Sequence, residues 1–206
     1  PPISTLFPYT TLFRSEQAAM ATGVIVGLTG LVGLTLGGWL ADKIHQRWAT
    51  GRLVFAAVSM LIAALATGYA LLAGRVEVAV FVALFSIGWL FAYNFYTCVY
   101  TAIQDVIEPR LRATAMALFF AGLYLLGGGL GPLAVGMLSD HYSNAAMLAA
   151  GASEMNETFK AVGLHNAMYL IPVALLVTMV ALLQASRCFV SDAATMQQGM
   201  QARSGS

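Results

Sequence analysis

The sequence predicts an all-α integral membrane protein with about five transmembrane helices. Of its 206 residues, 59% are hydrophobic and only 9% are charged, whereas soluble domains carry about 25% charged residues. Five apolar runs each reach the roughly 20 residues that a helix needs to cross the hydrocarbon layer, and none contains Asp, Glu, Lys or Arg. The runs do not alternate with period two, so helices are predicted over a β-barrel. They are residues 19–41, 53–74, 78–103, 113–138 and 164–186.

The chain divides into three segments by composition. Residues 7–15 read FPYTTLFRS, which resembles the conceptual translation of a sequencing adapter. We therefore expect residues 1–15 to be an assembly artefact, with native sequence from Glu16 and a gene truncated at its N-terminus; a genuine amphipathic lead-in is the alternative. Residues 16–187 form the predicted transmembrane bundle, and residues 188–206 a disordered cytoplasmic tail.

Charge in the connections predicts an orientation. One side carries seven Lys and Arg residues, in connections 42–52 and 104–112 and in the tail after residue 186, and the other side carries two. Positive residues stay in the cytoplasm during insertion. The C-terminus is therefore predicted to be cytoplasmic, and the long connection 139–163 external.

Glycines in the first run share faces of a helix. Gly23 and Gly27 are four residues apart, and so are Gly33 and Gly37. Small residues at this spacing let helices approach closely in lipid. We predict that both pairs pack against neighbouring helices.

The third run differs from the others because it carries a polar stripe. At about 100° per residue, seven polar side chains fall within about 60° of Thr97, while Phe95, Cys98, Val99 and Ala102 lie on the opposite face. Such a stripe is costly against lipid, so it either lines a cavity for a small or amphipathic solute or makes hydrogen bonds between helices. The stripe is Ser86, Tyr93, Asn94, Thr97, Tyr100, Thr101 and Gln104.

The fourth run contains Gly127-Gly128-Gly129-Leu130-Gly131-Pro132. Proline removes a backbone donor and clashes with the preceding turn, so a bend is predicted near Gly131 and Pro132. A bent, glycine-rich helix can rock or pack tightly against a partner.

Two sets of residues resemble the major facilitator superfamily. Residues 38–43, GWLADK, look like its loop motif G-x-L-A-D-[RK]-x-G-[RK]-[RK], although His45 replaces the second glycine and Gln46 a basic residue. Residues 102–115, AIQDVIEPRLRATA, and 129–140, GLGPLAVGMLSD, are similar to bacterial members of the spinster-like branch.

The resemblance implies a fold, a function and a location. The five runs would match helices 8–12 of the major facilitator fold, with the first seven helices missing, and the third run would line the central cavity. The chain would be a fragment of a secondary active transporter of the bacterial inner membrane that works by alternating access. Its partners would be the lipid bilayer, a small-molecule or lipid-like solute, and a coupling proton or sodium ion.

The resemblance also suggests residues that change contacts during transport. Asp42 would cap or neutralise a helix N-terminus in the other half of the transporter, because such ends attract carboxylates; an ordinary solvated charge at a helix end is the alternative. Asp105, Glu108, Arg110 and Arg112 would form a cytoplasmic gate network, with a plain solvated loop as the alternative. The full candidate set is Gly38, Asp42, Lys43, Arg110, Arg112, Gly131 and Pro132.

Other functions fit the sequence less well. An intramembrane enzyme would need a nucleophile with a base, or a metal cluster, at membrane depth, and the runs contain no Asp or Glu. We expect no enzyme activity, no cofactor, no metal and no nucleic-acid partner. The remaining alternative is a non-transporting membrane scaffold or receptor, in which the polar stripe packs against a neighbouring helix.

Overall fold

The computed structural model describes residues 22–73 and 78–204, and these residues form helices and short connections. The predicted artefact at residues 1–15 lies outside the described residues. The elements are η2 (Val24–Leu28), α2 (Thr29–His45), α3 (Gly51–Ala73), α4 (Val78–Ala92), α5 (Asn94–Val106), η3 (Pro109–Leu111), α6 (Arg112–Gly122), η4 (Leu123–Leu130), α7 (Gly131–Ala149), α8 (Glu157–Ala167) and α9 (Leu170–Ser204).

Four continuous helical stretches in the described residues are long and apolar enough to cross a membrane. They are Gly51–Leu72, Ala79–Val106, Pro109–Ala149 and Glu157–Ala202, with mean hydropathies of 1.6 to 2.1. They confirm four of the predicted runs, and the described part of the first run is helical through η2 and α2. The predicted all-α membrane class is therefore confirmed.

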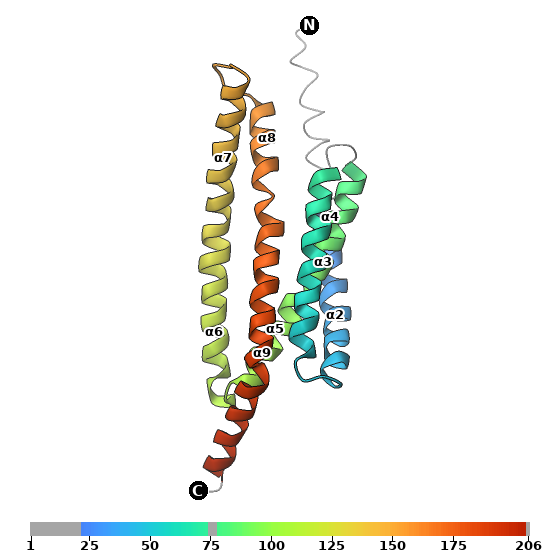
Figure 1. Ribbon diagram of the computed structural model, residues 1–206, viewed down its shortest axis with the longest axis vertical. Coiled ribbons are helices and arrows are strands. Elements are labelled where there is room, and N and C mark those ends of the chain that lie inside the picture. The colour runs from blue at the N-terminus through green and yellow to red at the C-terminus, as the bar shows by residue number, and fades with distance from the viewer. Residues whose placement is uncertain (1–21, 74–77, 205–206) are drawn as a thin grey trace.

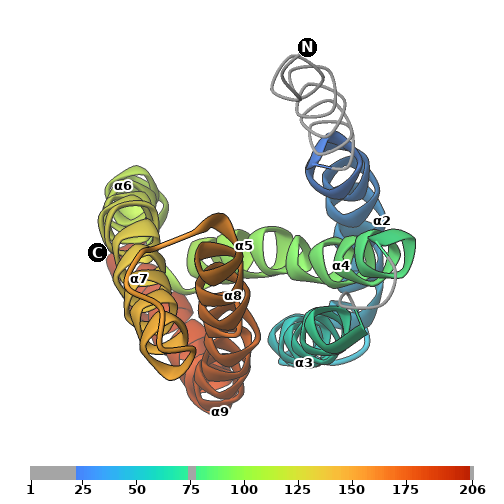
Figure 2. The same ribbon diagram turned by 90° about the horizontal axis from the view of Figure 1, so that it is seen from above.

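The helices form two groups that α4 and α5 connect (Figure 1 and Figure 2). Seen from above, α4 and α5 form a bar between α2 and α3 at one end and α6 to α9 at the other. The most extensive helix pairs are α7 with α8, α3 with α9 and α3 with α4. The bar therefore has one face toward α3 and α9, while α2 and α6 flank its other face.

Small side chains build the core where α3, α5 and α9 meet. Ala56 and Ala57 of α3 are at most 1% exposed and pack with Cys98 and Ala102 of α5. Alanines let helix backbones approach closely in lipid, where burial of apolar surface supplies little driving force. The face of α5 that we predicted to be apolar is thus the buried face, and partly buried Phe95 packs against the same cluster.

Gly33 and Gly37 bring α2 against α4 and α5. A Cβ atom at Gly33 would lie 2.6 Å from the backbone oxygen of Leu90, and one at Gly37 would overlap Oδ1 of Asn94. Gly23 and Gly27 have no neighbour within 4 Å among the described residues. The predicted packing role therefore holds for the second glycine pair only.

Two helices continue further than the hydropathy predicted. α7 runs to Ala149 and α8 begins at Glu157, so most of the expected external connection 139–163 is helical. α9 runs to Ser204, so residues 188–204 are helical and not disordered as we expected; residues 205–206 of the expected tail lie outside the described residues. Alanine, methionine and glutamine are good helix formers, and adding residues to an existing helix avoids the unfavourable step of nucleation.

Gly131 and Pro132 do not break the fourth membrane helix. The chain switches to a π-helical segment, η4, and α7 then begins at Gly131 with Pro132 in its first turn. Proline is tolerated there, because local π-helical adjustments in a membrane helix re-satisfy the backbone groups that a proline leaves unbonded. Figure 1 shows α6 and α7 as one column, so a π-helical segment stands where we predicted a bend.

Candidate functional site

The polar stripe lies along α4 and α5, away from most of the core. Ser86, Tyr93, Thr97, Tyr100 and Thr101 are partly exposed. Gln104 is exposed, and Asn94 alone is buried. The structure therefore keeps the seven residues together on one side of the bar but places them in different environments.

Three hydroxyl groups of the stripe donate hydrogen bonds to their own helix. Ser86 donates to the carbonyl oxygen of Val82 at 2.6 Å, and Thr101 to that of Thr97 at 2.7 Å. Thr97 donates to the carbonyl oxygen of Asn94 at 3.1 Å. Because each proton is used within the helix, the oxygen lone pairs are left to accept from a solute or water.

Tyr93 and Asn94 make the hydrogen bonds between helices that our alternative interpretation required. Asn94 is 3% exposed, and its Nδ2 donates to Oγ of Ser59 at 3.0 Å. The Tyr93 hydroxyl donates to the carbonyl oxygen of Val26 at 3.1 Å. Asn94 therefore joins α5 to α3, and Tyr93, just before α5, bonds to η2. The accessible part of the stripe is Thr97, Tyr100, Thr101 and Gln104.

An aromatic series borders this accessible part, and the sequence analysis missed it. The ring centroids of Tyr96 and Tyr100 are 5.6 Å apart, those of Tyr100 and Phe120 are 5.2 Å apart, and those of Phe120 and Tyr124 are 6.3 Å apart. The series carries the surface from α5 onto α6 and η4. Its signal in the sequence was the spacing of four residues in Tyr96/Tyr100 and Phe120/Tyr124, which places each pair on one helix face.

Arg52 joins three helix ends in a double ion pair. One amino group lies 2.8 Å from Oδ1 of Asp42 at the end of α2, and the other lies 2.7 Å from Oδ2 of Asp105 at the end of α5. The Arg52 side chain is 11% exposed, while Asp42 is 61% and Asp105 42% exposed. In the sequence Arg52 indicates only orientation, because nothing local points to a partner 53 residues away.

The remaining gate candidates make local contacts. Nζ of Lys43 lies 4.9 Å from the ring centroid of Trp39, a cation–π distance. Arg110 pairs with Glu108 at 2.7 Å, and Nε of Arg112 donates to the carbonyl oxygen of Ile107 at 3.3 Å. Asp42 is therefore linked to Asp105 through Arg52 and not through Lys43, Arg110 or Arg112.

The three glycine and proline candidates lie in two separate places. A Cβ at Gly38 would lie 3.7 Å from the Thr97 side chain, so Gly38 adjoins the accessible part of the stripe. Gly131 has open space around it, and Pro132 is exposed on the α6–α7 column. The structure thus brings Gly38 to the stripe and leaves Gly131 and Pro132 apart from it.

Known proteins share sequence and structure with this chain, while no protein-family model matches it. The chain is 31% identical over 126 residues to "Protein spinster" of Drosophila melanogaster, covering 61% of the chain and 21% of that protein. It is 33% identical over 130 residues to an "MFS-type efflux pump" of Mycolicibacterium smegmatis, covering 60% and 28%.

A structural relative agrees with these two sequences. The crystal structure of a bacterial homologue of the human lysosomal transporter Spinster, inward-facing and unoccupied, superimposes with a TM-score of 0.66 and 25% sequence identity. It covers 80% of this chain and 38% of the relative. The chain thus spans less than two fifths of the length of each of these relatives.

Proposed function

The chain is a homologue of major facilitator superfamily transporters, spinster among them, and from this premise we propose that it forms part of a secondary active transporter. The transporter moves a small or amphipathic solute by alternating access. The helices of this chain correspond to helices 8–12 of that fold, and α4 with α5 is the helix that lines the central cavity.

The observation that carries the proposal is the accessible polar face of α5. Thr97, Thr101 and Gln104 lie within or at the end of a membrane-crossing stretch and are accessible, unlike the buried Cys98 and Ala102. Polar groups facing lipid are unfavourable, and polar groups at membrane depth usually face protein or a water-filled cavity. This supports a path that solutes enter.

The chemistry of this face suggests the class of solute. Hydroxyls and one amide offer hydrogen bonds without a charge, and the ring series from Tyr96 to Tyr124 offers apolar contact beside them. A solute with a polar end and an apolar body matches both parts of the surface. A multiply charged solute would find no counter-charge along Thr97, Thr101 and the rings.

The double ion pair of Arg52 supports alternating access at one end of the bundle. Asp42 is 61% exposed and uses Oδ1 on Arg52, so its other oxygen can meet a helix N-terminus in the other half of the transporter. The proposed gate also includes Gly38, Lys43, Arg110 and Arg112. The element that moves during transport is the part of the helix around Gly131 and Pro132. Such contacts form and break as two bundles rock about a central site.

The orientation follows from the distribution of positive charge, which we propose places the Arg52 end and the C-terminus in the cytoplasm of a bacterial inner membrane. A proton or sodium ion is the proposed coupling ion. A scaffold that does not transport would also contain the Asn94–Ser59 hydrogen bond, but it would not require accessible hydroxyl groups at Thr97 and Thr101.

Removing both accessible threonine hydroxyls should slow transport strongly. In a full-length transporter that contains this segment, Thr97→Leu with Thr101→Leu should slow ethidium efflux and uptake of a fluorescent single-chain amphiphile at least about tenfold, which corresponds to roughly 1.4 kcal/mol of lost solute interaction. Yield in the membrane should not change, because both hydroxyls bond only to their own helix.

The matched control is Thr178→Leu in α9. Thr178 donates to the carbonyl oxygen of Ala174 at 2.9 Å, so it makes the same type of bond from a helix away from the stripe. Transport of both probes by the double variant at the rate of this control would refute the assignment of the cavity face.

A further inference from the structure

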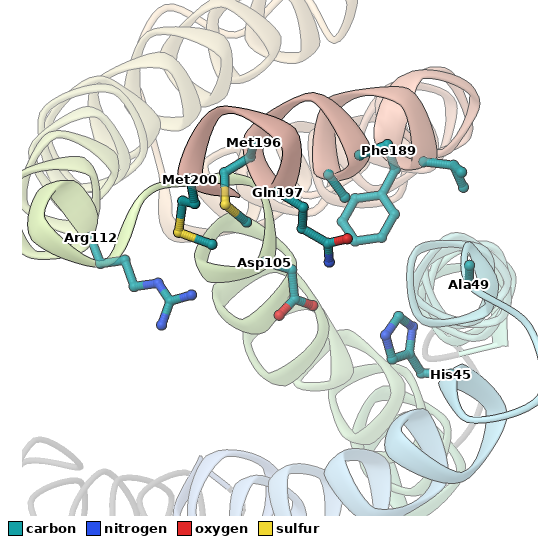
Figure 3. A pocket seen from close by; sticks show the side chains of 11 residues that line it. His45, Ala49, Asp105, Arg112, Phe189, Met196, Gln197 and Met200 are labelled. Atoms are coloured by element: carbon teal, nitrogen blue, oxygen red, sulfur yellow. The ribbon is translucent and has the colours of Figure 1, made fainter. Parts of the chain in front are cut away.

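We propose that a cavity at the C-terminal end of the bundle binds a free α-amino acid with an apolar side chain, taken from the aqueous phase. The cavity lies between the tail of α9 and the ends of α2, α5 and α6, and its volume is about 510 Å³ (Figure 3). Small-molecule sites typically have volumes of about 300–1,000 Å³. The proposal does not depend on transport.

The position of the cavity indicates a water-soluble ligand. α9 runs to Ser204, whereas the apolar run that it contains ends at Ser186. Met196, on the cavity wall, follows ten residues later, about 15 Å further at 1.5 Å per residue. Figure 1 shows this tail continuing below the ends of the other helices. The occupant is therefore bound from water and not from the hydrocarbon layer.

One wall of the cavity offers a cation for a carboxylate. Arg112 uses Nε on the carbonyl oxygen of Ile107 at 3.3 Å, and none of the ion pairs among the described residues involves it. Figure 3 shows its guanidinium group extending from α6 toward Asp105. The two terminal amino groups suit a carboxylate, which arginine binds through two parallel hydrogen bonds.

The same cavity offers a carboxylate oxygen for an ammonium group. Asp105 uses Oδ2 on Arg52 at 2.7 Å, which leaves Oδ1 for a ligand. Because Arg52 serves both Asp42 and Asp105, the three side chains together carry one net negative charge. No ion pair among the described residues joins Asp105 to Arg112, although both line the cavity. A ligand with one positive and one negative group can therefore pair with both.

The tail of α9 supplies apolar contact beside these two charges. Phe189, Ala193, Met196 and Met200 recur at helical spacing and all line the cavity. Phe189 is 7% exposed, and the two methionines are partly buried. Methionine side chains adapt to irregular apolar partners. An α-amino acid such as leucine combines the ammonium group, the carboxylate and the apolar side chain that the three parts of the cavity accommodate.

The test is thermal unfolding of the purified full chain in detergent, with L-leucine as the probe. At a concentration tenfold above its Kd, L-leucine should raise the Tm by about 3–6 °C, because a ligand that binds only the folded state stabilises it. Three analogues each lack one feature: N-acetyl-L-leucine the ammonium charge, L-leucinamide the carboxylate, and glycine the apolar side chain. Each analogue, at the same concentration, should give less than a third of that shift.

Two variants locate the site. Arg112→Gln should lose most of the L-leucine shift, whereas Arg110→Gln should keep it, because Arg110 pairs with Glu108 and is not part of the cavity wall. Met200→Gln guards against misfolding of Arg112→Gln. It retains both charges and a good helix former but makes the apolar wall polar, so it should also reduce the shift at least about threefold.

Each of the opposite results would overturn a stated part of the proposal. The absence of a saturable L-leucine shift would show that the cavity binds no such ligand. An equal shift with N-acetyl-L-leucine would exclude the contact with Asp105, and an equal shift with L-leucinamide would exclude that with Arg112. An equal shift with glycine would exclude the role of the methionines. An unchanged L-leucine shift in folded Arg112→Gln or Met200→Gln would place the amino acid elsewhere.

Discussion

Replacing Arg52 with glutamine should lower the free energy of unfolding by about 2 kcal/mol, because hydrogen bonds to charged groups contribute about 1.5–3 kcal/mol each but exposed partners weaken them. The Arg52 guanidinium is largely buried and holds Asp42 and Asp105, which are 61% and 42% exposed. Water therefore compensates part of the loss at each carboxylate. For a chain of this size the Tm should fall by about 4–8 °C.

The matched control is Arg47→Gln in the same connection, since Arg47 is exposed. It should change the Tm by less than about 1 °C, as surface substitutions usually have small effects. Asp105→Asn should matter less in the Arg52→Gln background than alone, because the two residues share one ion pair. Equal Tm values for Arg52→Gln and Arg47→Gln would show that the double ion pair does not stabilise the bundle.

Gly37→Ala should destabilise the bundle by about 1–3 kcal/mol through overpacking. The added Cβ would overlap Oδ1 of Asn94. That side chain is 3% exposed and bonded to Ser59 at 3.0 Å, so it cannot turn aside without losing its partner. Unfolding of the purified chain by denaturant or heat measures the effect.

The same contact predicts compensation in a double variant. In the Asn94→Ala background the obstructing amide is gone, so Gly37→Ala should have little effect there. Gly27→Ala, on the same helical segment but with nothing within 4 Å, should be tolerated in both backgrounds. If the losses in free energy of unfolding from Gly37→Ala and Asn94→Ala simply add, a methyl group at position 37 does not contact the Asn94 side chain as described.

Periodic features of the sequence predicted the spans and the sides of α5. Hydropathy and helical period depend only on residues that are close in the sequence. They therefore predicted the four spans that the structure describes. The same period put Cys98, Val99 and Ala102 on the buried face, where the structure has them. The glycine pair Gly33/Gly37 was found for the same reason.

Features that depend on distant residues were missed or assigned incompletely. Arg52 and Asp105 are 53 positions apart, and the rings of Tyr100 and Phe120 come from different helices. Asn94 has the same polarity as its neighbours on the stripe, yet Ser59 and Gly37 make it a packing residue. These environments arise only when the helices are placed against one another.

The hydropathy of the sequence also could not predict where the helices end. An apolar run marks where the chain crosses hydrocarbon, whereas a helix ends at a cap or a turn. α7 ends before Gly151, whose φ of 64° favours glycine, and α8 begins where Oδ1 of Asn156 accepts a hydrogen bond from the backbone N–H of Phe159 at 3.0 Å. The part of α7 that follows the apolar run, residues 139–149, was therefore read as a connection.

Water access along α5 tests the central claim most directly. Single cysteines are introduced in a Cys98→Ala, Cys188→Ser background, and inside-out membrane vesicles, which expose the proposed cytoplasmic end of α5, are treated with a charged, membrane-impermeant methanethiosulfonate. Cysteines at Thr97, Thr101 and Gln104 should react at least about tenfold faster than cysteines at buried Ala102 or at Leu65, which is 64% exposed on α3, since thiols react as thiolates and need water. If Thr97 and Thr101 react as slowly as Leu65, the stripe faces lipid or protein, and no solute path runs along this helix.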